Sequence, residues 1–178
     1  PTRSSSALAA LSVIPIMFGT SEVLGVAPAK DCQFRIFGSP VGPYFKGKSD
    51  SLYLKVSDYD RAAPHGTGNI KAGLNYAMSL YPITKAHEEG YNENLYLDPM
   101  TRTYVEETGG ANFFFVTKDN KVVTPKSDSI LPSITRRSIM TLAKDYLHLE
   151  TEERPVKLEE LKDFAECGLC GTAAVISP

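Results

Sequence analysis

Alternating apolar and polar positions along the chain predict short strands interrupted by helices. Residues 32–37 and 51–57 carry β-branched and aromatic side chains at alternating positions, which is typical of half-buried strands. The segment between them, residues 38–43, is rich in glycine and proline and predicts a turn. We therefore expect these two strands to pair as a hairpin.

Further apolar runs predict more strands, and two longer segments have helical spacing. The strands are expected at residues 95–97, 104–107, 113–116, 122–123 and 172–176. A helix is expected from Lys71, with Tyr76, Ala77, Leu80 and Ile83 on one face and with Pro82 ending or kinking it. A second helix is expected over residues 135–147, with Ile139, Leu142, Ala143, Tyr146 and Leu147 on one face, and a short one over residues 157–166.

Composition narrows the class of protein. The chain has 178 residues, 42% of them hydrophobic, which suits one domain with a core of ordinary size. Its net charge of -2 gives no electrostatic reason to expect nucleic acid or a membrane as a partner. Three cysteines leave at least one unpaired and favour a reducing compartment. We expect a cytoplasmic protein, with a mitochondrial location left open.

We interpret residues 1–14, which lack an initiator Met and acidic residues, as an altered terminus or an interdomain remnant.

Two ionisable residues match what a pyridoxal phosphate enzyme needs. Lys71 lies in the segment Gly-Thr-Gly-Asn-Ile-Lys-Ala-Gly, and an amine there could form a Schiff base with the cofactor's aldehyde. Glu107 lies in Glu-Glu-Thr-Gly-Gly-Ala-Asn and could face the pyridine nitrogen, because a protonated ring acts as an electron sink. Glu106, next to it, should point to the opposite face of the strand.

Two turns could hold a phosphate. The second helix begins near Ile134, so the first amides of that helix lack intrahelical acceptors, and Thr135 adds a hydroxyl. Gly171 and Thr172 form another small-residue turn with a hydroxyl. Each alone is explained as well by an ordinary cap or turn. The Cys-x-x-Cys pair at Cys167 and Cys170 lacks the setting of a redox or zinc motif, and we assign no metal site.

Six motifs together resemble the branched-chain amino acid aminotransferases, which are class IV, fold type IV enzymes. They lie, in the family's order, at residues 39–45, 61–68, 71–76, 107–112, 130–136 and 171–173. The resemblance covers residues 15–178 and implies an α/β (α+β) cofactor-binding domain whose mixed sheet curls into a pseudo-barrel with flanking helices. It also implies a homodimer that binds pyridoxal 5'-phosphate.

The resemblance assigns roles to individual residues. Lys71 would carry the Schiff base and move the substrate's α proton, Tyr76 would contact the cofactor's phenolic oxygen, and Glu107 would pair with its ring nitrogen. The remaining assignments are Ile134, Thr135 and Thr172 to the phosphate, Arg61 to the cofactor, and Gly110 and Ala173 to the substrate carboxylate. The implied reaction passes the amino group of leucine, isoleucine or valine to 2-oxoglutarate, giving branched-chain 2-oxo acids and glutamate.

Departures from the family pattern keep two alternatives open. Family members are longer, their amino-terminal domain supplies a phosphate-binding arginine, and they have a glycine where this chain has Leu74. We therefore interpret the chain as a truncated form, incomplete at its carboxyl end, and expect it to bind cofactor weakly and to have little activity. One alternative is a D-amino acid aminotransferase or aminodeoxychorismate lyase of the same fold. The other is an inactive fragment that serves as a folding or assembly unit.

Overall fold

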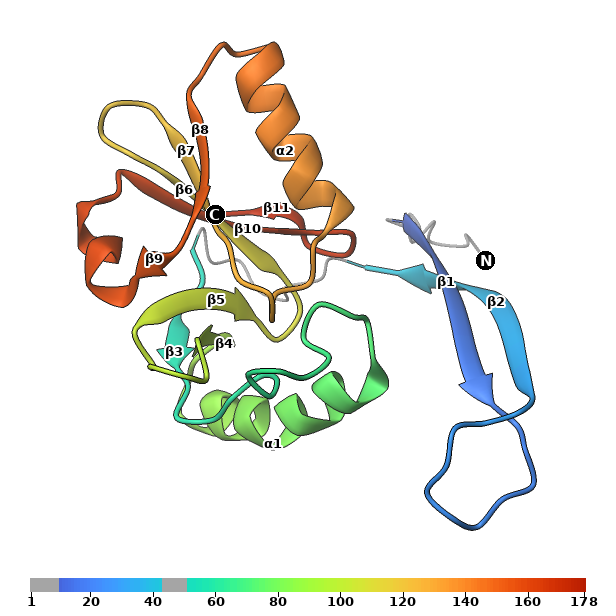
Figure 1. Ribbon diagram of the computed structural model, residues 1–178. Helices are drawn as coiled ribbons and strands as arrows, with labels where there is room; N and C mark the ends of the chain where they lie inside the picture. Colours follow the sequence, from blue (N-terminus) through green and yellow to red (C-terminus); the bar gives the residue numbers. More distant parts are fainter. Residues whose placement is uncertain (1–9, 43–50) are drawn as a thin grey trace, which may run out of the picture. The chain divides into compact units, whose positions relative to one another are not determined.

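The computed structural model describes residues 10–42 and 51–178, which fall into two compact units divided between Lys46 and Gly47 (Figure 1). The first unit contains one hairpin, and the second contains the helices and all other strands. None of the helices in these described ranges is both long and apolar enough to cross a membrane. The boundaries predicted from sequence, residues 1–14 and 15–178, remain a prediction.

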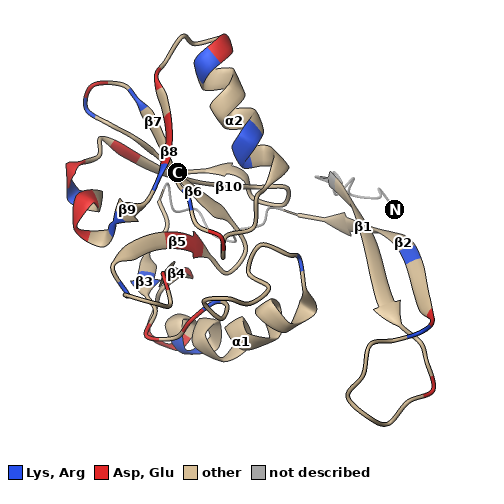
Figure 2. Cartoon of the chain, viewed as in Figure 1, with Lys and Arg blue, Asp and Glu red and all other residues tan. Residues whose placement is uncertain are grey.

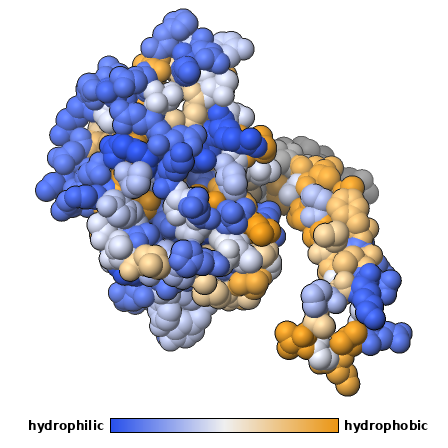
Figure 3. Space-filling view, viewed as in Figure 1, coloured by the Kyte–Doolittle hydropathy of each residue, from blue (hydrophilic) through white to orange (hydrophobic). Residues whose placement is uncertain are grey.

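The hairpin of the first unit pairs different strands from those we predicted. β1 (Ala10–Gly19) runs antiparallel to β2 (Cys32–Val41) in continuous register. The expected pairing of residues 32–37 with residues 51–57 is therefore wrong, and residues 38–41 are strand rather than turn. Pro40 is tolerated because both strands of a two-stranded ribbon are edges, where a missing N–H can face away from the partner. Figure 3 shows hydrophobic residues along this hairpin. Of the rest of the predicted turn, Gly42 follows the strand without regular secondary structure, and residue 43 lies outside the described residues.

The second unit is built on a mixed sheet that curls between two helices. Its elements are β3 (Leu54–Val56), α1 (Gly73–Glu88), β4 (Glu93–Leu97), β5 (Tyr104–Thr108), β6 (Asn112–Val116), β7 (Val122–Pro125), α2 (Ile134–Asp145), β8 (Thr151–Arg154), β9 (Val156–Lys157), η1 (Leu158–Asp163), β10 (Glu166–Gly171) and β11 (Val175–Ser177). The main order is β11-β10-β6-β5-β4-β3, with β7 and β8 continuing from β6 and β9 pairing with β5. The pairs β3–β4 and β7–β8 are parallel and the others antiparallel, so the predicted mixed sheet is confirmed.

Strand β5 pairs with different strands at its two ends. Glu107 pairs with Asn112 of β6 at one end of β5, while Tyr104 and Val105 pair with β9 at the other. Aromatic and β-branched side chains fill the core around this junction, with Tyr96, Val105, Phe113, Phe115, Val123 and Val156 almost completely buried. The strand that carries Glu107, β5, is thus fixed by a packed core.

α1 buries a different face from the one we predicted. Asn75, Ser79, Pro82 and Ala86 are buried, whereas Leu80 of the predicted face is 66% exposed. The helix also continues past Pro82 to Glu88, so the expectation that Pro82 could end it is wrong. Burial of Pro82 and Ala86 on the side that packs on β4 offsets the hydrogen bond that proline removes.

α2 and the carboxyl-terminal segment also differ in detail from the predictions. α2 ends at Asp145 and buries Arg136, Met140 and Ala143, with Met140 and Ala143 packing on Val122. Of the predicted face, Leu142, Tyr146 and Leu147 are exposed. The short helix is a 3-10 helix, η1, and residues 172–174 form the turn between β10 and β11 rather than a strand. A local apolar run could not reveal that Thr172 lies where the chain reverses.

Candidate active site

Lys71 is held at the start of α1 by a residue of the first helical turn. Its Nζ donates a hydrogen bond of 2.8 Å to the Oη of Tyr76 and lies 4.8 Å from the centre of the Tyr76 ring. Lys71 is exposed, and Tyr76 is half-buried. The two residues that sequence motifs assign to one end of the cofactor are therefore in contact, with a primary amine accessible to a ligand.

The backbone before Lys71 is fixed by Asn75, which the sequence analysis did not single out. Its Nδ2 donates to the carbonyl oxygens of Thr67 (2.8 Å) and Ile70 (3.0 Å), and its Oδ1 accepts from the Thr67 hydroxyl (3.0 Å). The side chain is only 1% exposed, so these bonds are shielded from water. The sequence signal that could have indicated these bonds is an asparagine one helical turn after the lysine.

Glu107 is a buried carboxylate with several donors around it. Its Oε2 accepts from the Asn112 amide (2.9 Å), its Oε1 accepts from the Leu131 N–H (3.1 Å), and the residue is 4% exposed. Burial raises the pKa of Glu107 to about 7, against the opposing effects of Arg61, the Leu131 N–H and Lys71. Figure 2 shows acidic residues in red on β5, the strand that contains Glu107.

Glu106 lies beside Glu107 in sequence but has separate partners. It accepts hydrogen bonds from the hydroxyls of Ser127 (2.7 Å) and Ser129. Glu106 is 3% exposed, so its carboxylate is hydrogen-bonded by hydroxyl donors rather than by bulk water. Only Glu107 of this acidic pair bonds to Asn112 and Leu131.

Arg61 is buried against Glu107. Its Nε lies 2.8 Å from Glu107 Oε1, and because the N–H is not aligned with that oxygen, the contact is an ion pair rather than a hydrogen bond. Its Nη2 donates to the carbonyl oxygens of Gly68 (2.8 Å) and Ser129.

The start of α2 lies close to Glu107 through the residues that precede it. Asn112 bonds both to Glu107 and to the Leu131 carbonyl oxygen (3.0 Å). Ser133 then caps α2 by accepting from the Arg136 N–H at 3.2 Å, with a φ of 51° that is uncommon outside glycine. The helix therefore begins at Ile134, as predicted, and presents the amides of Ile134 and Thr135 at its positive end.

The two turns assigned to the substrate carboxylate lie next to each other. A Cβ placed on Gly171 would lie 3.5 Å from the carbonyl oxygen of Gly110, so the turn that carries Thr172 and Ala173 approaches the β5–β6 turn. Thr108 closes the β5–β6 turn, since its Oγ1 accepts from the N–H groups of Gly110 (3.3 Å) and Ala111 (2.9 Å). The long bond to Gly110 leaves this amide weakly held.

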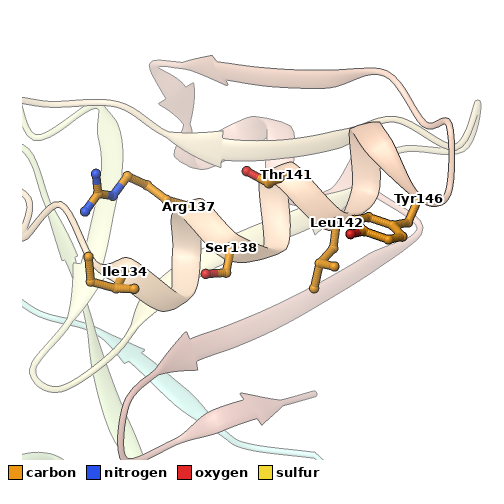
Figure 4. Close-up of a pocket in the computed structure, with 6 residues that line it drawn as sticks. All are labelled: Ile134, Arg137, Ser138, Thr141, Leu142 and Tyr146. Carbon is orange, nitrogen blue, oxygen red and sulfur yellow. The ribbon is translucent and has the colours of Figure 1, made fainter.

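A surface groove of about 580 Å³ lies elsewhere, on the exposed side of α2 (Figure 4). Its lining is Ile134, Arg137, Ser138, Thr141, Leu142 and Tyr146. Neither Lys71 nor Glu107 is in that lining, and Ile134 is its one residue among the candidate cofactor-binding residues. The groove is therefore separate from the Lys71 and Glu107 side chains. In the described ranges, no cluster of three or more histidine, cysteine or acidic side chains is placed to hold a metal ion.

Comparison with known proteins places this site in a family context. Residues 15–178 match the family model described as Amino-transferase class IV. A branched-chain-amino-acid aminotransferase of Helicobacter pylori is 49% identical over 173 residues, which is 96% of this chain and 51% of that protein. The chain thus spans about half the length of the curated relatives it matches.

Solved structures agree with the predicted fold. The branched-chain amino acid aminotransferase of Escherichia coli superposes with a TM-score of 0.82 at 34% identity, covering 93% of this chain and 55% of that one. That of Thermobaculum terrenum in its PLP-form gives a TM-score of 0.79 at 32% identity, covering 94% and 54%. The curled mixed sheet with flanking helices is therefore confirmed as the fold of these enzymes.

Proposed function

Since the chain belongs to the class IV aminotransferases, we propose that it carries the pyridoxal 5'-phosphate site of a branched-chain amino acid transaminase. The observation that carries this proposal is one connected set of contacts. Lys71 touches Tyr76, Asn75 fixes the loop before Lys71, and Arg61 joins that loop to Glu107.

The side chains fit the cofactor at each of its three ends. The accessible amine of Lys71 suits its aldehyde, the buried carboxylate of Glu107 suits a protonated ring nitrogen, and the first amides of α2 suit a phosphate. When bound, pyridoxal phosphate supplies a carbonyl that links to an amine and a ring that accepts the electron pair of a broken Cα–H bond.

Each residue of the proposed site has a role that follows from its position. Tyr76 orients the Lys71 amine and offers its hydroxyl to the phenolic oxygen. Nζ of Lys71 is the base that we assign to the substrate's α proton. Thr135 and Thr172 add hydroxyl donors for the phosphate, and the amides of Gly110 and Ala173 face the substrate carboxylate. The remainder of the substrate is an aliphatic side chain, for which shape and apolar contact decide binding.

The test is to trap the amine that binds the cofactor. The protein is incubated with excess pyridoxal 5'-phosphate, reduced with borohydride and mapped by peptide mass spectrometry. We expect one pyridoxyl adduct, on Lys71, that is lost in Lys71→Arg and kept in a Lys144→Arg control. An adduct that persists at full yield in Lys71→Arg would contradict the assignment.

A donor panel separates the proposal from the alternatives. With 2-oxoglutarate as acceptor and excess pyridoxal 5'-phosphate, we expect slow formation of glutamate from L-leucine, L-isoleucine and L-valine, and none from D-alanine. Pyruvate released from aminodeoxychorismate would instead favour a lyase. The names of the relatives favour the branched-chain reaction, and the same panel run with the Lys71→Arg variant gives the background rate.

A further inference from the structure

Arg61 connects three segments that carry the proposed site. Its Nε pairs with Glu107 on β5. Its Nη2 donates to the carbonyl oxygen of Gly68, in the loop that precedes Lys71, and to that of Ser129, in the segment that leads to α2. Arg61 is 5% exposed, so these contacts are shielded from water. One guanidinium therefore holds the amine side, the ring-nitrogen side and the phosphate side together.

The backbones that Arg61 joins are in close contact. A Cβ placed on Gly68 would lie 2.1 Å from the Ser129 carbonyl oxygen, a distance that real side chains do not adopt. The backbone of residue 68 thus lies against the Ser129 carbonyl group only because residue 68 is glycine. Arg61 supplies the donor that both carbonyl groups need when they are buried.

The charge of Arg61 also matters for Glu107. A buried carboxylate stays ionised only when a positive group or hydrogen-bond donors offset the loss of water. The charged groups that act on Glu107 are Arg61 and Lys71, which favour its ionised form, and Glu106, which opposes it. Arg61 has the largest of these effects and is the cation in direct contact.

We propose that Arg61 is a positioning residue, which favours the ionised form of Glu107, aims its carboxylate at the ring nitrogen, and joins the loop before Lys71 to the segment before α2. This inference rests on the proposed function, because the ring nitrogen belongs to pyridoxal phosphate. Arg61 acts on the cofactor through Glu107, whose ionised carboxylate can accept the ring N–H.

The test measures the Glu107 carboxyl directly, without cofactor. Protein labelled with ¹³C at glutamate carboxyl carbons is titrated by NMR, and the Glu107 signal is identified by its absence in Glu107→Gln. In Arg61→Gln, which keeps a donor but loses the charge, we expect the acid dissociation constant of Glu107 to fall by roughly tenfold or more. In Arg61→Lys, which keeps the charge, we expect a change of less than about threefold.

Arg154→Gln is the matched control. Arg154 pairs with Glu152 and Glu160 and donates to the Pro155 carbonyl oxygen, so its loss removes similar contacts without touching Glu107. We expect the Glu107 titration to be unchanged. A folded Arg61→Gln protein with the wild-type titration would overturn the inference, and so would an equal change in Arg154→Gln.

A measurement on the unaltered protein covers the case in which Arg61→Gln does not fold. The ¹⁵N signal of Arg61 Nε, which lies 2.8 Å from Glu107 Oε1, should titrate with the same midpoint as the Glu107 carboxyl. An Nε signal that does not change with pH would refute the coupling.

The borohydride experiment tests the proposed function separately. An adduct on Lys71, together with a Glu107 titration that is unchanged in Arg61→Gln, rejects only the inference about Arg61. A changed Glu107 titration without an adduct on Lys71 rejects the function, and with it the role toward the ring nitrogen.

Discussion

The Nζ of Lys71 lies 2.8 Å from the Oη of Tyr76, so the hydroxyl accepts a hydrogen bond from the amine that we assign to the cofactor. This contact links a loop residue to the first turn of a helix. The position of the amine therefore follows the position of α1.

Removing that hydroxyl should weaken cofactor binding. In Tyr76→Phe we expect the dissociation constant for pyridoxal 5'-phosphate to rise roughly fivefold, which corresponds to about 1 kcal/mol for one hydrogen bond. Absorbance titration with the cofactor measures it. Tyr81→Phe on the same helix is the control, because Tyr81 is exposed and its ring contacts Tyr59 rather than Lys71. Equal affinities for the two variants would contradict the prediction.

Two glycines near Lys71 should respond in opposite ways to alanine. In Gly68→Ala the new methyl group would meet the Ser129 carbonyl, and we expect a loss of at least about 2 kcal/mol of unfolding free energy. In Gly73→Ala the new methyl group meets nothing within 4 Å at the start of α1, and we expect a gain of up to about 1 kcal/mol. Urea unfolding measures both, and similar losses for the two would argue against the close approach at Gly68.

Glu107 should make the cofactor-free protein less stable as the pH rises. Its pKa is about 7 in the folded protein, above the ordinary value of 4.5, mainly because of burial. The folded state therefore binds the proton more tightly than the unfolded state, and the unfolding free energy falls as the pH rises from about 4.5 to about 7 and is flat above. The loss is on the order of 3 kcal/mol.

Glu107→Gln should remove this part of the pH dependence. Thermal unfolding measured across that range would show a flatter profile for Glu107→Gln than for the wild type. Glu159→Gln, at an exposed position on η1, serves as the control and should keep the wild-type profile. Parallel profiles for the wild type and Glu107→Gln would show that Glu107 does not titrate in this range.

The cap of α2 should contribute about 1 kcal/mol. Ser133→Ala removes the oxygen that accepts from the Arg136 N–H, and we expect that loss in unfolding free energy together with weaker phosphate binding. Ser138→Ala, at an exposed position of the same helix, should change stability by less than about 0.5 kcal/mol. Inorganic phosphate as a competitor of the cofactor provides the second measurement, and an unchanged inhibition constant would separate the cap from the phosphate site.

Local sequence predicted the start of α2, and short motifs brought forward several candidate site residues. Lys71 and Tyr76 share one loop and helix start, and Ile134 begins the helix expected from the apolar spacing. These features depend on neighbours within one or two turns, which a sequence displays directly.

Long-range partners were harder to predict. The pairing of β2 with β1 depends on which of several similar apolar strands meet, and local alternation does not specify that choice. The buried face of α1 is composed of Asn75, Ser79, Pro82 and Ala86, so hydrophobic spacing pointed to the opposite side. The partners of Arg61 come from three separate segments and share no motif with it.

The unequal depth of Lys71 and Glu107 gives the site a direction. Glu107 is 4% exposed, whereas Lys71 is exposed in the part of the chain that the structure describes. The carboxylate that we assign to the ring nitrogen would therefore be shielded from water, while the amine that we assign to the aldehyde would stay open to solvent. An incoming amino acid would reach the Lys71 end of the site first.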